Sequence, residues 1–330
     1  MVIFLHWKKR LTTLAVLSGL AIGTMHIMNK IVNYLSNKDD KLYNENSLYY
    51  EWRFGRIRYH KYGKGSPILL IHDLNVCSSS AEWNKIVSDL AKTNTVYTLD
   101  LLGCGCSDKP HFTYTNYLYV QLITNFIKHV ISEKTDVITV GRSCSFVLMA
   151  CANNNSIINR VILINPNDLV DLAKIPTKQT KMLQQLIELP ILGTFLYNML
   201  INKKTIEKSL RSHYFYNEEL VDEHLVSTCF ESSHRDKTSG KYLFASIKSR
   251  YTNANTLYAL NHIDNSIFII VGNNNPEFEL IADQYQNYMP SIEIIGIDHT
   301  KYLPHIEMPE KFVEQVEILF DINNSEELST

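Results

Sequence analysis

Residues 137–145 read VITVGRSCS and decide the fold: a β-branched apolar run passes through Gly141-Arg142-Ser143-Cys144-Ser145 into an apolar, helix-like stretch. The order strand, sharp turn, helix with a central serine follows the pattern G-x-S-x-G, in which small residues flank a nucleophile. Gly141 and Ser145 meet the need for small residues, since the turn brings their Cβ positions close to neighbouring strands. The segment therefore indicates Ser143 as a candidate nucleophile. The simpler alternative is that Ser143 only caps a helix.

Short apolar runs recur on both sides of this segment. They are typical of strands buried on both faces of a mainly parallel sheet. Helical patterns at Ala81–Leu90 and Tyr117–Ile131 separate the earlier runs. The alternation predicts an α/β fold with a doubly wound, mainly parallel sheet. The expected strands are an opening hairpin (Tyr49–Phe54, Arg56–Tyr62) and then Pro67–Ile71, Thr95–Leu99, Val137–Val140, Arg160–Ile164, Ser266–Val271 and Ile292–Ile297.

The alternation stops between residues 169 and 263, where only helical patterns occur. We predict a core in two parts, 48–168 and 264–330, with a helical lid inserted at 169–263. Aromatic residues of the insertion are more commonly core than ligand contacts, but any that face a cleft would favour an apolar or acyl-bearing ligand. The expected helices are Lys181–Leu189, Thr194–Leu200, Glu218–Ser233 and Gly240–Tyr251.

The N-terminal region has the composition of a membrane anchor. Basic residues at 8–10 precede Leu11–Met28, which holds no formal charge if His26 is neutral. No small-x-small cleavage site follows Ile22, so residues 1–36 are predicted to be an uncleaved single-pass anchor, with 37–47 as a polar linker. The positive-inside rule then places the domain on the extracytoplasmic side. The alternative is an amphipathic helix lying on the membrane.

Composition argues against several other classes of protein. The formal net charge of −2 gives no sign of a nucleic-acid partner, which would usually need a clustered basic face. The six cysteines show no paired C-x-x-C spacing, so we expect free thiols, no metal site and no cofactor. Gly103-x-Gly105 has no third glycine opening a helix, which disfavours dinucleotide binding.

Two further motifs carry a family resemblance. His72-Asp73-Leu74-Asn75 follows the strand ending at Ile71, and residues 100–110 (DLLGCGCSDKP) follow the next strand. With the segment around Ser143, they resemble the α/β-hydrolase fold superfamily of lid-bearing serine hydrolases, from about residue 49 to residue 320. The resemblance implies an oxyanion hole formed by the backbone amides of Leu74 and Cys144. Asp73 departs from the family's usual glycine, and a carboxylate beside an oxyanion is unfavourable unless it points away.

The same resemblance shows two substitutions in the catalytic triad. Residues 302–310 (YLPHIEMPE) match the family pattern H-x-P-x-x-E-x-P-E with Tyr302 in place of the histidine. Asn275 stands where the acid of a G-x-x-D-P pattern belongs. A serine hydroxyl needs a base to accept its proton, and tyrosine, with a pKa of about 10, is protonated near neutral pH.

Nearby residues are candidate replacements for the missing base and acid. His299 is the preferred base and His305 the second candidate, while Glu277 is the first choice for the acid. Two functions follow. One is a membrane-anchored serine hydrolase that cleaves an ester or other acyl substrate through Ser143. The other is a catalytically impaired relative that binds a small apolar ligand or a partner. Other candidate acids are Glu279, Asp298 and Asp168.

Overall fold

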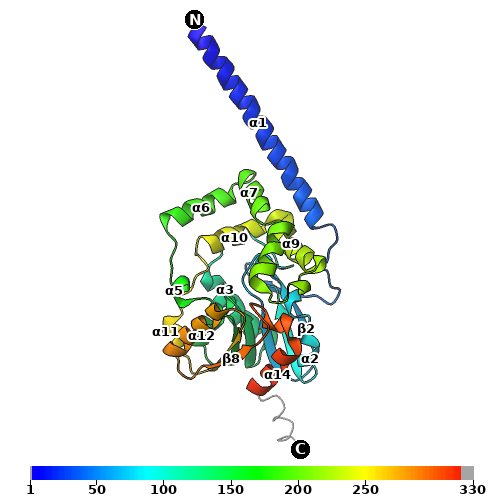
Figure 1. The fold of residues 1–330 in the computed structure, drawn as a ribbon, viewed down its shortest axis with the longest axis vertical. Coiled ribbons are helices and arrows are strands. Elements are labelled where there is room, and N and C mark those ends of the chain that lie inside the picture. The colour runs from blue at the N-terminus through cyan, green and yellow to red at the C-terminus, as the bar shows by residue number, and fades with distance from the viewer. Residues whose placement is uncertain (1, 321–330) are drawn as a thin grey trace, which may run out of the picture.

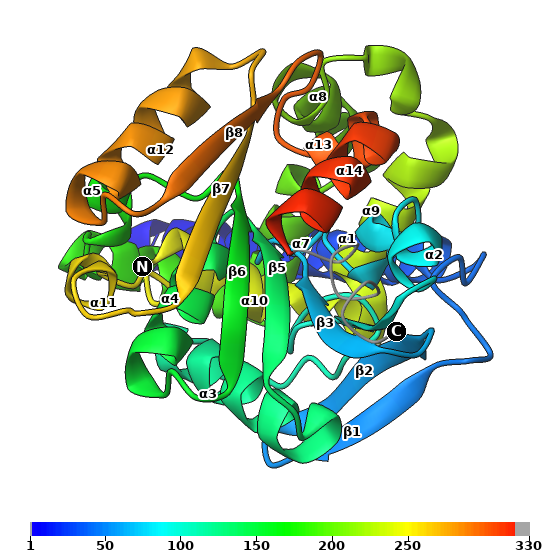
Figure 2. The same ribbon diagram turned by 90° about the horizontal axis from the view of Figure 1, so that it is seen from below.

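The computed structural model describes residues 2–320, which form a three-layered α/β domain and a long projecting helix (Figures 1 and 2). The centre is an eight-stranded sheet in the order β1-β2-β4-β3-β5-β6-β7-β8. The β1–β2 and β2–β4 pairs are antiparallel, and all pairs from β3 onward are parallel. The predicted mainly parallel sheet is confirmed. Its strands are β1 (Leu48–Trp52), β2 (Gly55–Tyr62), β3 (Ser66–Ile71), β4 (Asn94–Leu99), β5 (Thr135–Val140), β6 (Ile158–Ile164), β7 (Ser266–Gly272) and β8 (Glu293–Ile297).

Both faces of the sheet are covered, which explains why its central strands are apolar throughout. In β3, Leu69 and Ile71 contribute to one core cluster, whereas Ile68 and Leu70 contribute to the other. Figure 2 shows the strands from below, with helices on either side. The covering helices are α3 (Asn116–Phe126), α4 (Ser143–Asn153) and α12 (Pro276–Tyr288) on the first face, and α2 (Val87–Leu90) and α14 (Pro309–Leu319) on the second.

One predicted helix is wrong. Residues 81–90 form a 3₁₀ turn at Ser80–Trp83 and the single α-helical turn α2. The Ser80 amide donates to the Asp100 carboxylate at 2.7 Å, and the Trp83 side chain is fully buried. These two contacts fix the start of the segment in a tighter turn than an α-helix.

The interval between β6 and β7 is helical, as predicted. The expected helix Glu218–Ser233 is interrupted, because Asp222 caps a new helix by accepting a hydrogen bond from the Leu225 amide. Whether the segment acts as a lid stays a prediction. Its α-helices are α5 (Leu169–Leu172), α6 (Lys178–Glu188), α7 (Leu192–Leu200), α8 (Lys203–Ser209), α9 (Glu223–Thr238), α10 (Gly240–Lys248) and α11 (Leu257–Leu260). Of these, α6, α7, α9 and α10 lie above the sheet in Figure 1, and α5 and α11 lie beside it.

Helix α1 (Val2–Ser36) projects away from the domain, and residues 10–24 are exposed along their whole length (Figure 1). Its part from Arg10 to Ser36 is long and apolar enough to cross a membrane, although a signal sequence would have the same properties. Near its base the helix is docked: Asn29 is buried and donates to the Ile191 carbonyl at 3.0 Å, while Asn198 donates to Asn29 at 2.9 Å.

The predicted linker, residues 37–47, has no helix or strand but is packed on the domain. Leu42 is buried, its carbonyl accepts from the Arg58 guanidinium at 2.5 Å, and the Lys41 amide donates to the Glu231 carboxylate at 2.6 Å. The segment therefore fixes α1 relative to α9. The last predicted core residues, 321–330, lie outside the described part of the chain.

Candidate active site

A cavity of about 1030 Å³ lies at the carboxyl ends of the strands. Loops that follow β3, β5, β6, β7 and β8 supply one side of it, and the inserted helices supply the other. This edge of an open parallel sheet is the usual place for ligands in α/β proteins. We therefore take this cavity as the candidate active site.

Ser143 lies next to this cavity but does not open into it. It is the first residue of α4, directly after the turn at Gly141, and it is fully buried. Its hydroxyl donates to the His72 carbonyl at 2.7 Å. Within residues 2–320, no hydrogen bond joins this hydroxyl to an imidazole or a carboxylate. The arrangement leaves the serine without a base.

Tyr302 and Asp73 cover the turn before Ser143. Gly141 has a φ of +56°, and a Cβ on it would lie 1.9 Å from the Tyr302 hydroxyl and 2.6 Å from Asp73 Oδ1. The Arg142 amide donates to the same Oδ1 at 2.9 Å. Both Tyr302 and Asp73 line the cavity. Glycine is thus required at position 141 both for its backbone conformation and for the space taken by these two side chains.

The electrostatics of this pair favour a protonated phenol. Burial and the nearby Asp73 carboxyl raise the pKa of Tyr302 well above its usual value. Burial also raises the pKa of Asp73, although hydrogen bonds from the Arg142 amide and the Tyr302 hydroxyl act in the opposite direction. Tyr302 is therefore a hydrogen-bond donor at neutral pH and cannot serve as a general base.

The backbone around Tyr302 is held from two sides. The Tyr302 amide donates to the Tyr214 carbonyl at 3.1 Å, and the Asn165 side chain donates to the Tyr302 carbonyl at 2.9 Å. The rings of Tyr214 and Tyr302 meet edge to face, with centroids 4.9 Å apart. The Asn75 amide group donates to the Tyr214 hydroxyl at 3.1 Å. Tyr302 thus belongs to a packed aromatic and polar cluster.

Glu307 explains why part of the family pattern persists without the histidine. Its carboxylate accepts from the backbone amides of Lys301 and Tyr216, each at 2.7 Å, and from that of Asn217 at 3.1 Å. These bonds tie the loop after β8 to the inserted segment. The retained glutamate therefore has a structural use that does not depend on catalysis.

The amides predicted to form an oxyanion hole are engaged elsewhere. The Cys144 amide donates to the Gly141 carbonyl at 3.3 Å. The Leu74 amide interacts with the Asp73 carboxyl. The unfavourable carboxylate anticipated from the sequence is therefore directed toward this site, and the role of the two amides stays a prediction.

The structure does not bring the predicted base to Ser143. His299 has a φ of +62°, is exposed, and contacts the Tyr216 ring at a centroid distance of 5.7 Å. His305 is fully buried and stacks on Trp83 at 4.5 Å. Its Nε2 lies 3.7 Å from the Glu82 carboxylate, and burial lowers the pKa of His305 to about 3.

Within residues 2–320, none of the candidate acids is hydrogen-bonded to His299 or His305. Asn275 caps α12 by accepting from the Glu277 amide at 3.2 Å, and Glu277 itself lines the cavity. Asp168 caps α5 and also accepts from Gln284 at 3.1 Å. Of the other two candidates, Asp298 accepts from Asn273 at 2.7 Å, and Glu279 lies in the first turn of α12.

Sequence reasoning did not identify Arg142 and Glu82 as residues of this cavity, and it named Tyr214 only among the aromatic residues of the insertion. Arg142 and Tyr214 line it beside Tyr302, and Glu82 lines it beside Asp73. Burial raises the pKa of the Glu82 carboxyl well above its usual range, and the neighbouring Asp73 adds to this effect. The second residue of a G-x-S-x-G pattern directly precedes the serine, so the pattern itself could have identified Arg142 as a residue of the cavity. No sequence signal identifies Glu82.

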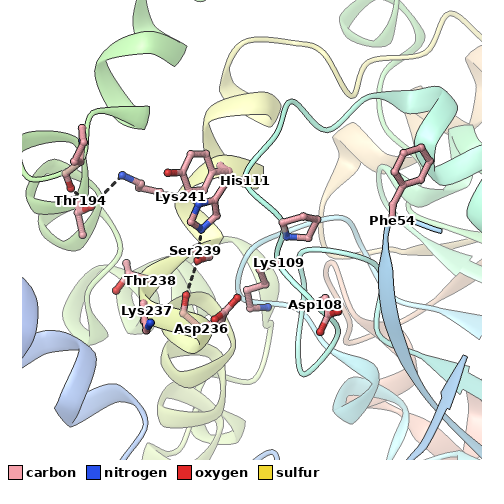
Figure 3. Close-up of a pocket in the computed structure, with 13 residues that line it drawn as sticks. Phe54, Asp108, Lys109, His111, Thr194, Asp236, Lys237, Thr238, Ser239 and Lys241 are labelled. Atoms are coloured by element: carbon pink, nitrogen blue, oxygen red, sulfur yellow. Dashed lines mark hydrogen bonds between the residues drawn. The ribbon is translucent and has the colours of Figure 1, made fainter. Parts of the chain in front are cut away.

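A second cavity, of about 700 Å³, lies between the loop after β4 and the end of α9 (Figure 3). Asp236, Lys237 and Thr238 at its wall have φ values of +54°, +55° and +65°. His111 Nε2 lies 2.9 Å from the Ser239 hydroxyl, and the Lys241 amine donates to the Leu189 carbonyl at 2.9 Å and to Thr194 at 3.0 Å. These hydrogen bonds use the polar groups of the wall to join neighbouring segments to one another. We therefore interpret this cavity as a gap where the inserted helices meet.

Residues 68–315 match the sequence profile described as the alpha/beta hydrolase family, which is more than half of the chain. The match spans the sheet from β3 onward and all five loops that shape the cavity. The chain belongs to the alpha/beta hydrolase family.

Curated relatives in this family match only part of the chain. A 2-hydroxy-6-oxo-6-(2'-aminophenyl)hexa-2,4-dienoic acid hydrolase from Metapseudomonas resinovorans is 27% identical over 115 residues, 34% of this chain and 40% of the relative. A soluble epoxide hydrolase from Corynebacterium sp. (strain C12) is 26% identical over 110 residues, 33% of this chain and 38% of the relative. The chain thus spans about two fifths of the length of these relatives.

Solved structures of hydrolases share the fold. A serine hydrolase involved in carbazole degradation superposes with a TM-score of 0.69 at 16% identity, covering 84% of this chain and 98% of its own. A membrane phospholipase A superposes with a TM-score of 0.67 at 15% identity, covering 96% of this chain and 99% of its own. At these identities the likeness supports the fold alone.

Proposed function

We propose that this alpha/beta hydrolase family member is a membrane-anchored, catalytically silent binding protein for a small, largely apolar ligand. The observation that carries the proposal is the environment of Ser143. Its side chain is fully buried and donates to a backbone carbonyl, while Tyr302 and Asp73, which line the cavity, pack over the turn that precedes it. A serine without a neighbouring base is a poor nucleophile.

The cavity suggests the chemistry of the ligand. Much of its wall is apolar, including Ile206, Leu210 and Leu225 from the inserted segment. Arg142 and Tyr302 lie on the side formed by the loops after the strands. Sites for small molecules commonly combine an apolar wall with a few polar groups that fix orientation. The ligand we propose has an apolar body and a polar end that bonds to Arg142 or Tyr302.

Membrane anchoring rests on α1. Its apolar part is exposed over residues 10–24. The superposition on the membrane phospholipase A covers 96% of this chain, a span that must include part of α1. We propose a single-pass anchor with the domain on the extracytoplasmic side.

A hydrolase acting on an ester or other acyl substrate is the second candidate, favoured by the hydrolase relatives. In that function, the loops carrying Tyr302 and Asp73 would move to expose Ser143, with His299 and Glu277 as base and acid. Labelling of the full-length protein by a fluorophosphonate probe separates the two functions, with Ser143→Ala as control. We expect no labelling; labelling that is absent from the variant would establish an active serine instead.

Ligand binding is tested with a fluorescent fatty acid and its methyl ester, titrated onto the full-length protein. Leu210→Trp, which adds bulk at the cavity wall, is expected to weaken binding. Leu280→Trp, at a residue exposed on α12 away from the cavity lining, is the matched control and should bind as wild type. Equal binding by both variants would contradict the proposed site.

A further inference from the structure

The outer surface of α6 and its connection to α7 carry several exposed apolar side chains. Met182 is 69% exposed, and Leu186, Leu189 and Leu192 are each about 40% exposed. The inward side of α6 buries Gln184 and Ile187. We call Met182, Leu186, Leu189 and Leu192, which recur every three or four residues, the α6–α7 face. A contiguous exposed apolar surface of this kind usually marks an interaction site.

The α6–α7 face lies on the side of the domain toward which α1 extends. Figure 1 shows α6 and α7 at the end of the domain from which α1 projects, with the outer part of α1 extending beyond them. The contact is direct, because Asn29 of α1 donates to the Ile191 carbonyl, between Leu189 and Leu192, at 3.0 Å.

The length of the apolar part of α1 sets where a membrane surface would lie. Leu11–Met28 spans about 27 Å at 1.5 Å per residue, close to the roughly 30 Å hydrocarbon core of a bilayer. It ends one residue before Asn29, which is docked on α7. No polar spacer separates the end of the apolar stretch from the α6–α7 face.

From this geometry we infer that the α6–α7 face lies in the interfacial layer of the bilayer that α1 crosses. The occupant of this face is then lipid, with the four apolar side chains among the upper acyl chains. Exposed Lys178 and Lys181 on α6, and exposed Lys30 at the base of α1, are placed to contact lipid phosphates. Interfacial helices commonly combine apolar residues with lysines in this way.

The test uses the full chain reconstituted in phosphatidylcholine and phosphatidylglycerol vesicles that contain a phospholipid with a diazirine on its acyl chain. After irradiation, labelled peptides are mapped by mass spectrometry. We expect labelling of α1 and of residues 182–192. Leu280 on α12 and Ile318 on α14 are matched internal controls, since they are 65% and 59% exposed but belong to elements on the domain's other side.

A double variant tests whether labelling of the α6–α7 face depends on its apolar side chains. Leu186→Glu with Leu189→Glu should lower labelling of residues 182–192 about tenfold or more, because charged groups are excluded from acyl chains, and leave labelling of α1 unchanged. Leu280→Glu should change neither. A thermal melt verifies that each variant is folded.

The inference rests on the proposed anchoring. The positions of the labelled peptides distinguish failure of the inference from failure of the anchoring. Labelling of α1 without residues 182–192 overturns the inference and leaves the anchor intact, whether water or a second copy covers the face. Absence of labelling from both segments overturns the anchor and the inference together. Labelling of both, lost from the face in the double variant, supports the inference.

Discussion

The loop after β4 and the loops after β7 and β8 both keep the spacing of the family's motifs, but they differ in what their side chains do. In the first, Asp100 pairs with Arg58 at 2.8 Å and accepts from the Ser80 and Cys106 amides, each at 2.7 Å. In the others, Asn275 caps a helix and Tyr302 covers the turn before Ser143.

The difference separates the requirements of folding from those of catalysis. A buried charge such as Asp100 is costly unless it is paired, so its motif cannot change without loss of stability. The triad positions carry no such constraint: an asparagine caps α12 and a tyrosine packs against Tyr214. A chain can thus keep the hydrolase fold while the base and the acid are replaced.

The strongest test of this comparison restores the triad. The triple variant Tyr302→His, Asn275→Asp, Asp73→Gly removes the two side chains over Gly141 and supplies a base and an acid. We expect the rate of fluorophosphonate labelling to rise roughly 10²–10⁴-fold, the usual contribution of a general base. The same variant with Ser143→Ala should stay unlabelled. A folded triple variant that does not react would show that the loops after β7 and β8 differ in more than these residues.

The next largest effect should come from the loop after β4. Arg58→Ala leaves Asp100 buried without its partner, so the free energy of unfolding in urea should fall by about 3–5 kcal/mol. Arg56→Ala is the control, since its pair with Asp108 is largely exposed and should contribute about 1 kcal/mol or less. Similar losses in both variants would remove the distinction drawn here.

The pH dependence of stability also tests the structural role of Asp100. Burial alone would raise the pKa of Asp100, but Arg58 and the backbone amides outweigh it and hold that pKa at about 2. Because this lies below the unfolded value near 3.8, the stabilisation is present above pH 4 and is lost as pH falls toward 2. It amounts to about 2 kcal/mol. Asp100→Asn should unfold with a flatter pH dependence over this range, as followed by circular dichroism; an unchanged slope would exclude this role.

The smallest effect is expected at the site itself. Tyr302→Phe keeps the ring packing on Tyr214 but removes the hydroxyl beside Asp73, so the free energy of unfolding should fall by about 1 kcal/mol. Tyr258→Phe, at a residue 72% exposed, is the control. A loss as large as that of Arg58→Ala would mean that Tyr302 is as important to the fold as the buried ion pair.

The sequence allowed the strands to be predicted because a strand buried on both faces is apolar throughout, as β3 and β7 are. The place of Ser143 followed from the turn it occupies. The direction of a side chain in a loop leaves no comparable pattern in the sequence. That His299 is exposed in a left-handed conformation, and that Asp73 and Tyr302 meet over Gly141, depends on contacts between segments far apart in the chain.

The docking of α1 has a mechanical consequence. Asn29 joins it to α7, and residues 37–47 return along α9, so the helix has no free hinge at its base. If α1 crosses a bilayer as proposed, the helix acts as a rigid stem that sets both the height and the tilt of the cavity. The domain would then search for its ligand by two-dimensional diffusion within the membrane plane and could not reach into bulk water on a flexible tether.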